Sequence, residues 1–211
     1  MTTVLYVTAH PFDKTASRSL TVGDAFLEAY RKANPEHTVT HVDLYHLDIP
    51  QLDAEVLTAW NQLKSSRPFE KLNQESQRKV GRLNELVEQF LAADKVVIVN
   101  PVWNFLFPPV LKAYIDAICI PGKTVKYGPE GITGLASDKK LLHIQSSGSV
   151  LSEGRWASFE FSHRYLAAIF NYMGLNAIDF IYVEGTGGAP EQAASNQKQS
   201  IRQALALAER F

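Results

Sequence analysis

The chain has 211 residues, of which 45% are hydrophobic and 20% are charged, and its formal net charge is −1. This length is enough for one domain with a sizeable core, and the near-neutral charge argues against a nucleic-acid-binding surface, which is normally basic. The single cysteine, Cys119, excludes an internal disulfide and lies in an apolar run, where a buried structural thiol is more common than a nucleophile.

The first ten residues, MTTVLYVTAH, contain no basic region and no long apolar stretch, so they do not resemble a signal peptide. No apolar run approaches the ~20 residues that are needed to span a bilayer. Together with the single cysteine, these features predict a cytoplasmic protein that has neither a membrane nor a nucleic acid as a partner.

Short apolar runs rich in β-branched residues alternate with amphipathic segments along the chain. The clearest run is Val96–Val99, which is followed by Asn100–Pro101 and is typical of a strand covered on both faces. We expect five strands, at 3–8, 38–44, 95–99, 140–145 and 177–183. Between and after them we expect helices from the N-cap Ser17 to about 33, at 53–60, 73–92 and 108–117, at 159–172 ending at Gly174, and at 193–210. The segment at 121–135 is rich in Gly and Pro and reads as a long loop.

Five strands separated by helices predict an α/β fold in which a parallel sheet has helices on both faces, within a single domain over residues 1–211. Two strand orders fit this pattern, the flavodoxin-like order 2-1-3-4-5 and a small Rossmann sheet. Neither G-x-G-x-x-G nor a Walker A motif follows the first strand. The usual motifs that hold a dinucleotide or a nucleoside triphosphate are therefore absent.

Three loops follow strands that are neighbours in the order 2-1-3-4-5, so they should converge at one edge of the sheet. The first carries Ser17, Arg18 and Ser19 at the start of a helix, where free N–H groups and the helix dipole attract an anion. Simple N-capping by Ser17 explains the same pattern, and both interpretations stay open. Taken alone, His10 is more simply an ordinary histidine at a strand end than a donor to a phosphate.

The second loop, 101–107, places Trp103, Phe105 and Phe107 around Asn104. A flat heteroaromatic ligand would stack on such a loop, although the same aromatic residues could instead belong to the core. The third loop, Ser146–Ser149, has small side chains that let backbone N–H groups approach a ligand, and an ordinary turn is its alternative.

The loops contain none of the residues that usually carry catalysis by a side chain. The six histidines show no metal-ligand spacing, G-x-S-x-G is missing, and no pair of carboxylates falls in the three loops. A site without a strong acid, base or nucleophile is typical of a protein whose chemistry belongs to a cofactor.

With these motifs in view, the chain resembles the FMN-dependent NADH-azoreductases of the flavodoxin-like superfamily, which are also quinone reductases. The resemblance covers nearly the whole chain, and its motifs occur in the same order as in that family. They are Ser17-Arg18-Ser19, Pro101-Val102-Trp103-Asn104-Phe105, Pro108 with Leu111-Lys112 and Ile115-Asp116, Gly122-Lys123-Thr124 with Tyr127, Gly128-Pro129 and Gly131, and Ser146-Ser147-Gly148-Ser149.

The resemblance implies a flavodoxin-like three-layer sandwich with the strand order 2-1-3-4-5. It places the FMN phosphate on the first loop, the isoalloxazine ring along the second and the pyrimidine end of the ring at the third. The implied cofactor-binding residues are His10, Ser17, Arg18, Ser19, Pro101, Val102, Trp103, Asn104, Phe105, Ser146, Ser147, Gly148 and Ser149. No side chain is expected to be catalytic.

The resemblance further implies that NADH reduces bound FMN, which then reduces a quinone or an azo compound in a second half-reaction. It also implies a homodimer with the site near the subunit interface. The aromatic residues of the second loop and Pro108 favour a dimer too, unless the 121–135 segment folds back over them. Whether Phe107 lies in the interface stays open. Departures from the family pattern are His10, Val102-Trp103 and Val125, which concern the substrate-facing wall more than the FMN site.

Other function classes stay open at this point. A flavodoxin that only carries electrons is usually strongly acidic, which this chain is not. A nucleotide-binding regulatory module without turnover is a third class. A preference for NADPH over NADH also stays open, because the placement of Lys123, Lys126 and Arg155 cannot be fixed from the sequence.

Overall fold

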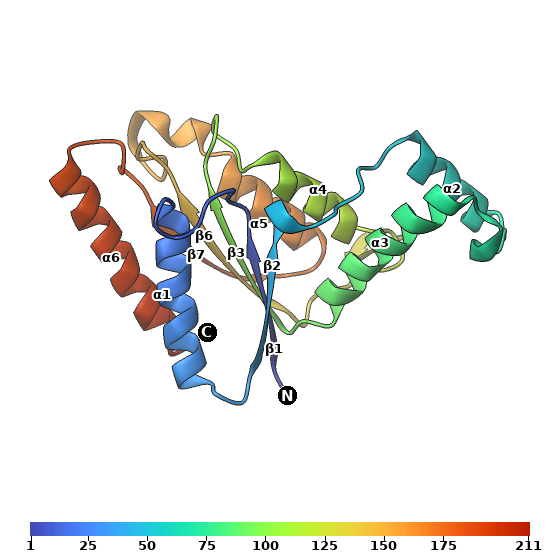
Figure 1. The fold of residues 1–211 in the computed structure, drawn as a ribbon, viewed down its shortest axis with the longest axis horizontal. Helices are drawn as coiled ribbons and strands as arrows, with labels where there is room; N and C mark the ends of the chain where they lie inside the picture. Colours follow the sequence, from blue (N-terminus) through green and yellow to red (C-terminus); the bar gives the residue numbers. More distant parts are fainter.

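The central element of the structure, a computed structural model that describes residues 1–211, is a five-stranded parallel sheet (Figure 1). Its strands are β1 Thr3–Thr8, β2 Thr38–Asp43, β3 Lys95–Pro101, β6 Lys140–Ser146 and β7 Ala177–Val183, in the order β2-β1-β3-β6-β7. Because β4 and β5 lie outside this sheet, the order is the flavodoxin-like 2-1-3-4-5. The predicted fold class is confirmed.

Helices cover both faces of the sheet and complete three layers (Figure 1). On one face α1 (Arg18–Ala33) packs against α6 (Pro190–Ala208), and on the other lie α3 (Gln74–Leu91), α4 (Pro109–Ile118) and α5 (Ser162–Tyr172). The helix α2 (Ala54–Lys64) packs against α3 at the side of the molecule. Short 3-10 turns lie at Leu44–His46, Phe69–Lys71 and Gly154–Phe159.

The strand β3 shows why the central strands are continuous apolar runs. Val96 and Ile98 pack in the core under α3, α4 and α5, whereas Val97 and Val99 pack in the core under α1 and α6. Successive side chains of a strand point to opposite faces, so a strand covered on both sides must be apolar at every position. The edge strand β2 has one sheet neighbour and only one fully buried residue, Val42.

The excursion between α4 and β6 is more ordered than the sequence suggested. Residues Val125–Gly128 (β4) and Gly131–Gly134 (β5) form an antiparallel hairpin that packs against the end of α5. A Cβ atom at Gly134 would lie 2.2 Å from the backbone nitrogen of Gly174, so only glycine permits this contact. Gly174 has a φ of 102° and ends α5 as predicted.

Most other boundaries agree with the sequence analysis to within two residues, and three helices differ by more. The helix α2 extends four residues beyond the predicted end at 60, and α6 begins at Pro190 rather than 193. The helix α5 begins at Ser162 rather than 159, because a 3-10 turn occupies Gly154–Phe159. No helix has both the length and the apolar character that crossing a membrane would require.

Candidate active site

The loops that follow β1, β3 and β6 meet at the carboxyl edge of the sheet, at the top of Figure 1. They enclose an open cleft of about 220 Å³. Its lining residues are His10, Ala16, Ser17, Arg18, Pro101, Val102, Trp103, Ser146, Ser147, Gly148 and Thr186. Nine of the residues proposed from the sequence are therefore brought together, whereas Ser19, Asn104, Phe105 and Ser149 do not line the cleft.

At the first loop, Ser17 is the N-cap of α1, and its Oγ accepts a hydrogen bond from the backbone N–H of Leu20 at 3.3 Å. The hydroxyl groups of Ser17 and Ser19 lie 3.1 Å apart, and Ser19 is fully buried behind Ser17. Ser19 therefore supports Ser17 from beneath. The open N-terminus of α1 leaves backbone N–H groups for an anion.

Arg18 supplies the positive charge of this loop. Its guanidinium donates a hydrogen bond from Nη1 to Oε1 of Gln197, on α6, at 2.6 Å. A neutral carboxamide partner orients the guanidinium without cancelling its charge, which stays available to attract a phosphate.

His10, at the end of β1, faces the cleft as a neutral side chain. Burial lowers the pKa of its imidazole below the ordinary value of 6.5. Its Nδ1 accepts a hydrogen bond from the backbone N–H of Phe12 at 3.1 Å, so the proton of the neutral ring resides on Nε2. His10 can therefore donate a hydrogen bond to an anion but does not add a positive charge near pH 7.

The second loop forms a tight turn with an unusual backbone conformation. Trp103 and Leu106 exchange backbone hydrogen bonds of 2.7 and 3.1 Å, and the residues between them, Asn104 and Phe105, have φ angles of 50° and 69°. Positive φ at both central positions corresponds to a type I′ turn, which usually has Asn followed by Gly. The turn leaves the side chains of Trp103 and Phe105 about two-fifths exposed, at 41% and 39%.

The alternative that the aromatic residues of this loop belong to the core is correct for the last of them, Phe107. Phe107 is only 4% exposed and packs against Tyr165 of α5, with ring centroids 5.4 Å apart. Phe107 is therefore buried within one chain and is not an exposed candidate for an interface between subunits. Val125 is likewise 1% exposed and belongs to the core, so it does not form part of a substrate-facing wall.

The third loop is fixed by the segment that follows β7. The hydroxyl of Thr186 donates to the carbonyl of Ser147 at 2.9 Å, and the N–H of Gly187 donates to the carbonyl of Gly148 at the same distance. Thr186 also lines the cleft. Sequence analysis missed Thr186 and Ala16, and the only signal for Thr186 was the glycine-rich stretch at 185–188.

Comparisons with known proteins agree with this geometry. A family model described as "Flavodoxin-like fold" matches residues 2–207. The FMN-dependent NADH:quinone oxidoreductase of Geobacillus kaustophilus is 50% identical over the full length of both chains, and FMN-dependent NADH:quinone oxidoreductase 2 of Bacillus subtilis is 45% identical over the same span. The chain belongs to the family of FMN-dependent NADH:quinone oxidoreductases. The resemblance drawn from the motifs is confirmed.

Solved structures extend this family to azoreductases. The azoreductase of Bacillus anthracis str. Sterne has a TM-score of 0.94 and 33% identity, with complete coverage of both chains. The FMN-dependent NADH-azoreductase of Bacillus anthracis str. Ames Ancestor, solved in complex with FMN, has a TM-score of 0.89 and 34% identity, covering 99% of this chain and 100% of its own.

The residues of the cleft fit the flavin mononucleotide that names the family. The N-terminus of α1 with Arg18 suits a phosphate, the Trp103–Leu106 turn offers exposed aromatic rings for a flat heterocycle, and the Ser146–Ser149 turn offers backbone N–H groups.

Next to this cleft, four exposed aromatic residues form a patch, which we call the aromatic patch: Phe105, Trp156, Phe159 and Phe161. The ring of Phe105 lies 5.0 Å from that of Phe159 and 6.4 Å from that of Trp156, and Phe159 lies 6.4 Å from Phe161. Sequence analysis missed this grouping because it placed Phe159 and Phe161 in a helix and gave Trp156 no role.

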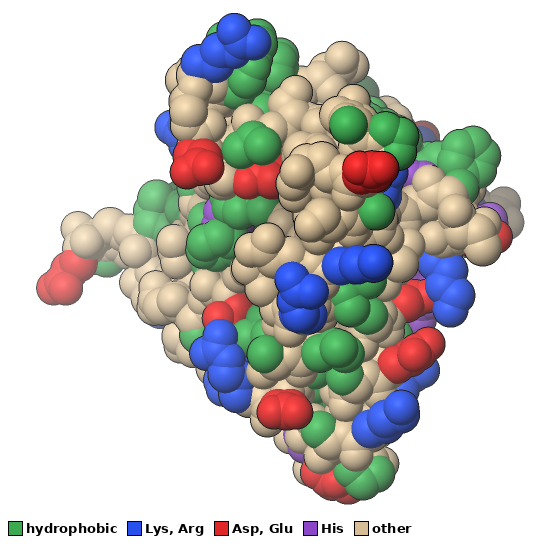
Figure 2. Space-filling model, turned by 90° about the vertical axis from the view of Figure 1, so that its left-hand side faces the viewer, with side chains coloured by type: hydrophobic (Ala, Val, Ile, Leu, Met, Phe, Trp, Pro, Cys, Tyr) green, Lys and Arg blue, Asp and Glu red, His purple; other side chains and the backbone are tan.

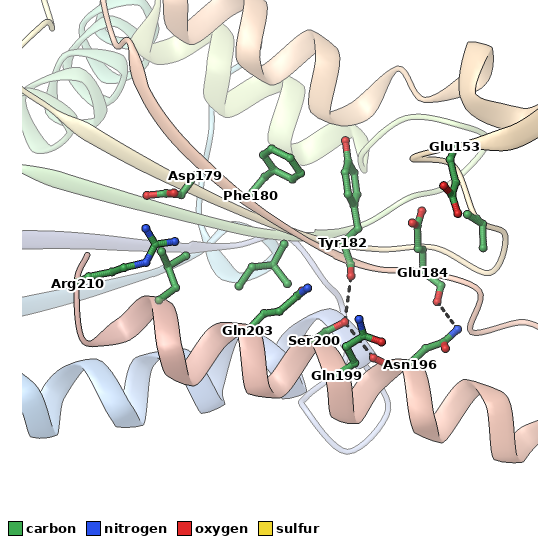
Figure 3. A pocket seen from close by; sticks show the side chains of 13 residues that line it. Glu153, Asp179, Phe180, Tyr182, Glu184, Asn196, Gln199, Ser200, Gln203 and Arg210 are labelled. Carbon is green, nitrogen blue, oxygen red and sulfur yellow. Dashed lines mark hydrogen bonds between the residues drawn. The ribbon is translucent and has the colours of Figure 1, made fainter.

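A larger cavity lies elsewhere, between the edge strand β7 and α6 (Figure 3). It has a volume of about 570 Å³, and its charged lining residues are Glu153, Asp179, Glu184 and Arg210. Ser200 and Asn196 on α6 donate to the carbonyls of Tyr182 and Glu184, both at 3.0 Å. An excess of carboxylates disfavours a phosphate, so this cavity is a poor flavin site.

The outer face beside this cavity has a mixed surface. Figure 2 shows acidic and basic side chains interspersed with hydrophobic ones, without a continuous basic area on that face.

The single cysteine, Cys119 at the end of α4, is half-buried, and burial raises the pKa of its thiol. A thiol that resists ionisation is a poor nucleophile, and Cys119 is not among the residues that line the cleft.

Proposed function

We propose that this protein binds FMN non-covalently in the cleft and catalyses two-electron transfer from NADH to quinones and to aromatic azo compounds. One observation carries the proposal: an anion site, an exposed aromatic turn and a turn with free N–H groups converge in one cleft. The chain is also up to 50% identical over its full length to oxidoreductases named for this reaction.

When bound, FMN supplies the redox chemistry, and the side chains supply its position and surroundings. Ser17, the N-terminal N–H groups of α1 and Arg18 hold the phosphate, with His10 as a further donor. The loop from Pro101 to Phe105 would lie along the flavin ring. The nicotinamide and the acceptor use the same exposed side of the cleft in turn, which gives ping-pong kinetics.

The third loop would supply backbone donors to negative charge on a bound flavin ring. The N–H of Ser147 is already bonded to the carbonyl of Val183 at 3.0 Å. The N–H of Gly148, which lines the cleft, has no such partner within the chain, so it is the donor that can face the ring. Preorganised backbone donors of this kind stabilise developing charge without reorganising.

We also propose that the whole chain acts as one FMN-binding domain, that two chains form a homodimer and that the protein works in the cytoplasm. The exposed aromatic patch supports the dimer, because contiguous exposed apolar surface usually marks an interface. Light scattering should give twice the chain mass of 23.5 kDa. A monomer mass with full turnover would show that one chain builds the site alone.

The function is tested by flavin uptake followed by turnover. The purified protein should take up FMN, NADH should bleach the flavin absorbance, and a quinone should restore it. Initial rates at varied NADH and quinone should give the parallel double-reciprocal lines of a ping-pong reaction. Absence of flavin uptake at micromolar FMN would refute the proposal, and an accumulating semiquinone during NADH titration would favour an electron carrier instead.

The same assay decides between the two nicotinamide donors. We propose NADH, as in the names of the relatives, and expect a higher kcat/KM for NADH than for NADPH. A clear preference for NADPH would contradict this choice while leaving the flavin chemistry in place.

A further inference from the structure

Directly beneath the second loop, buried polar side chains replace the apolar core on the face of the sheet that α5 covers. On β3 this face carries Val96, Ile98 and then Asn100. The register pairs Ile98 with His143 and Asn100 with Gln145 on β6, and all three polar side chains are at most 2% exposed. Burial of polar groups adds no stability over apolar packing, so their restriction to the loop end of the strands calls for another explanation.

These side chains form a hydrogen-bonded chain that reaches the loop. The amide Nδ2 of Asn100 donates to the carbonyl of Pro101 at 3.0 Å, and its Oδ1 lies 2.9 Å from Nε2 of His143. The Nδ1 atoms of His143 and His163, which is on α5, are 2.9 Å apart, and the two rings are stacked at 16°. The Oγ of Ser162 accepts a weaker bond from Asn100 at 3.4 Å.

The geometry and the lowered pKa of His143 together fix the arrangement of protons. Because a carbonyl oxygen only accepts, the amide group of Asn100 must present Nδ2 to Pro101 and Oδ1 to His143. His143 must then carry its proton on Nε2. Burial lowers the pKa of His143 well below its ordinary value, so its ring is neutral and its Nδ1 accepts. The proton between the two rings therefore belongs to Nδ1 of His163.

The outer end of the chain is also held in place. The ring of His163 lies 4.7 Å from that of Phe180 and 5.7 Å from that of Tyr182, both on β7. Its backbone N–H donates to Oε1 of Glu160 at 2.8 Å, and Glu160 also accepts from Nε2 of Gln145 at 2.9 Å. Along the chain of side chains, His163 on α5 donates to His143 on β6, and His143 donates to Asn100. Asn100 in turn donates to the carbonyl of Pro101, the last residue of β3.

We propose that His143 and His163 are positioning residues of the flavin site, which act through Asn100 to fix the carbonyl of Pro101 and with it the start of the 101–106 loop. Pro101 and Val102 line the cleft, and the N–H of Val102 is bonded to the carbonyl of Ser146 at 2.7 Å. Fixing the Pro101 carbonyl therefore sets the peptide plane from which the aromatic turn departs. The inference rests on the proposed function, because it takes this loop to lie along the flavin ring.

The test compares the binding of FMN and of riboflavin, since a loop along the ring acts on both ligands alike. The His143→Leu variant loses the hydrogen bond to Asn100. It should raise the Kd of both ligands by about tenfold, the equivalent of about 1.4 kcal/mol, and should shift the visible flavin band. His143→Gln places an amide nitrogen where Nε2 was and should restore binding to within about threefold of the native protein. His163→Phe keeps the stacked ring without its donor and should weaken both ligands less.

Leu141→Ala is the matched control, because Leu141 lies on the same face of β6 but away from the loop. This variant should lose stability and leave both Kd values within about twofold, since a cavity there touches no group of the cleft. An equal effect of Leu141→Ala and His143→Leu would show that the chain is merely structural. Weakened binding of FMN alone would place the effect at the phosphate, and either result would overturn the proposal.

A second measurement covers the case in which His143→Leu does not fold. In the native protein loaded with FMN, imidazole ¹⁵N NMR should show the Nε2–H form of His143 and the Nδ1–H form of His163. The opposite forms would break the chain and refute the inference. A native protein that binds neither ligand would instead refute the proposed function and this inference with it.

Discussion

The turn at Trp103–Leu106 stores strain that substitution can reveal. Phe105 has a φ of 69°, in the left-handed region, where an L-residue other than glycine costs roughly 1–2 kcal/mol. Elsewhere, glycine is about 0.5–1 kcal/mol less favourable than alanine because it loses more conformational freedom on folding. At position 105 the strain term should prevail, so Phe105→Gly should be more stable than Phe105→Ala by about 0.5–1 kcal/mol.

The comparison of glycine with alanine removes the aromatic ring in both variants, so the lost contacts to Trp156 and Phe159 cancel. Leu106 is the control, because it lies in the same turn, is similarly exposed and does not have a positive φ. There Leu106→Gly should be less stable than Leu106→Ala by about 0.5–1 kcal/mol. The order of the two variants thus reverses between adjacent positions.

Urea unfolding of the flavin-free variants, followed by far-ultraviolet circular dichroism, measures these differences. A difference of 1 kcal/mol corresponds to about 2–4 °C in Tm for a chain of this size, so thermal scans provide a check. The reasoning would be refuted if Phe105→Gly were less stable than Phe105→Ala by as much as at position 106. Strain of this kind often lies at functional sites, which agrees with the place of the turn beside the cleft.

Three further predictions concern the phosphate site, the buried histidines and a helix end. The Ser17→Ala variant, which removes one hydroxyl donor to the charged phosphate, should weaken FMN by about 1.5–3 kcal/mol but barely affect riboflavin in fluorescence titrations, and equal losses would place the phosphate elsewhere. The native pKa of His143 lies below the unfolded value of 6.5, so the unfolded chain binds more protons below that pH. The contribution of His143 to the free energy of unfolding should therefore be complete above pH 6.5, and the free energy should fall by up to about 1.4 kcal/mol per pH unit below it. His143→Gln should flatten this slope in urea titrations at different pH, and an unchanged slope would contradict the prediction. Lys139 is buried and donates to the carbonyls of Leu91 and Ala93, both at 2.7 Å, at the end of α3. Lys139→Met should lower the free energy of unfolding by about 2–4 kcal/mol, and a loss under 1 kcal/mol would show that water replaces the ammonium group.

Local sequence determined most of the fold. The bounds of β1 and β7, the N-cap at Ser17 and the glycine after α5 agree with the structure, because each depends on a short pattern of apolar spacing or on the backbone preference of one residue. The order of the strands followed from alternating strands and helices together with the motifs of a known family. The three loops could be assigned to one edge because parallel strands end on the same side.

Tertiary structure decided what depends on residues far apart in the chain. No local pattern near Val125 or Gly134 predicts that their hairpin packs against α5, and Phe107 is buried in a core that includes a contact with Tyr165, which is distant in the sequence. The six histidines show no paired spacing in the sequence, yet His143 and His163 meet across 20 residues and join Asn100. Each helix and strand forms from a pattern of apolar spacing and turn residues within its own segment. The contacts between distant residues depend instead on where the helices pack over the sheet, which local propensity does not encode.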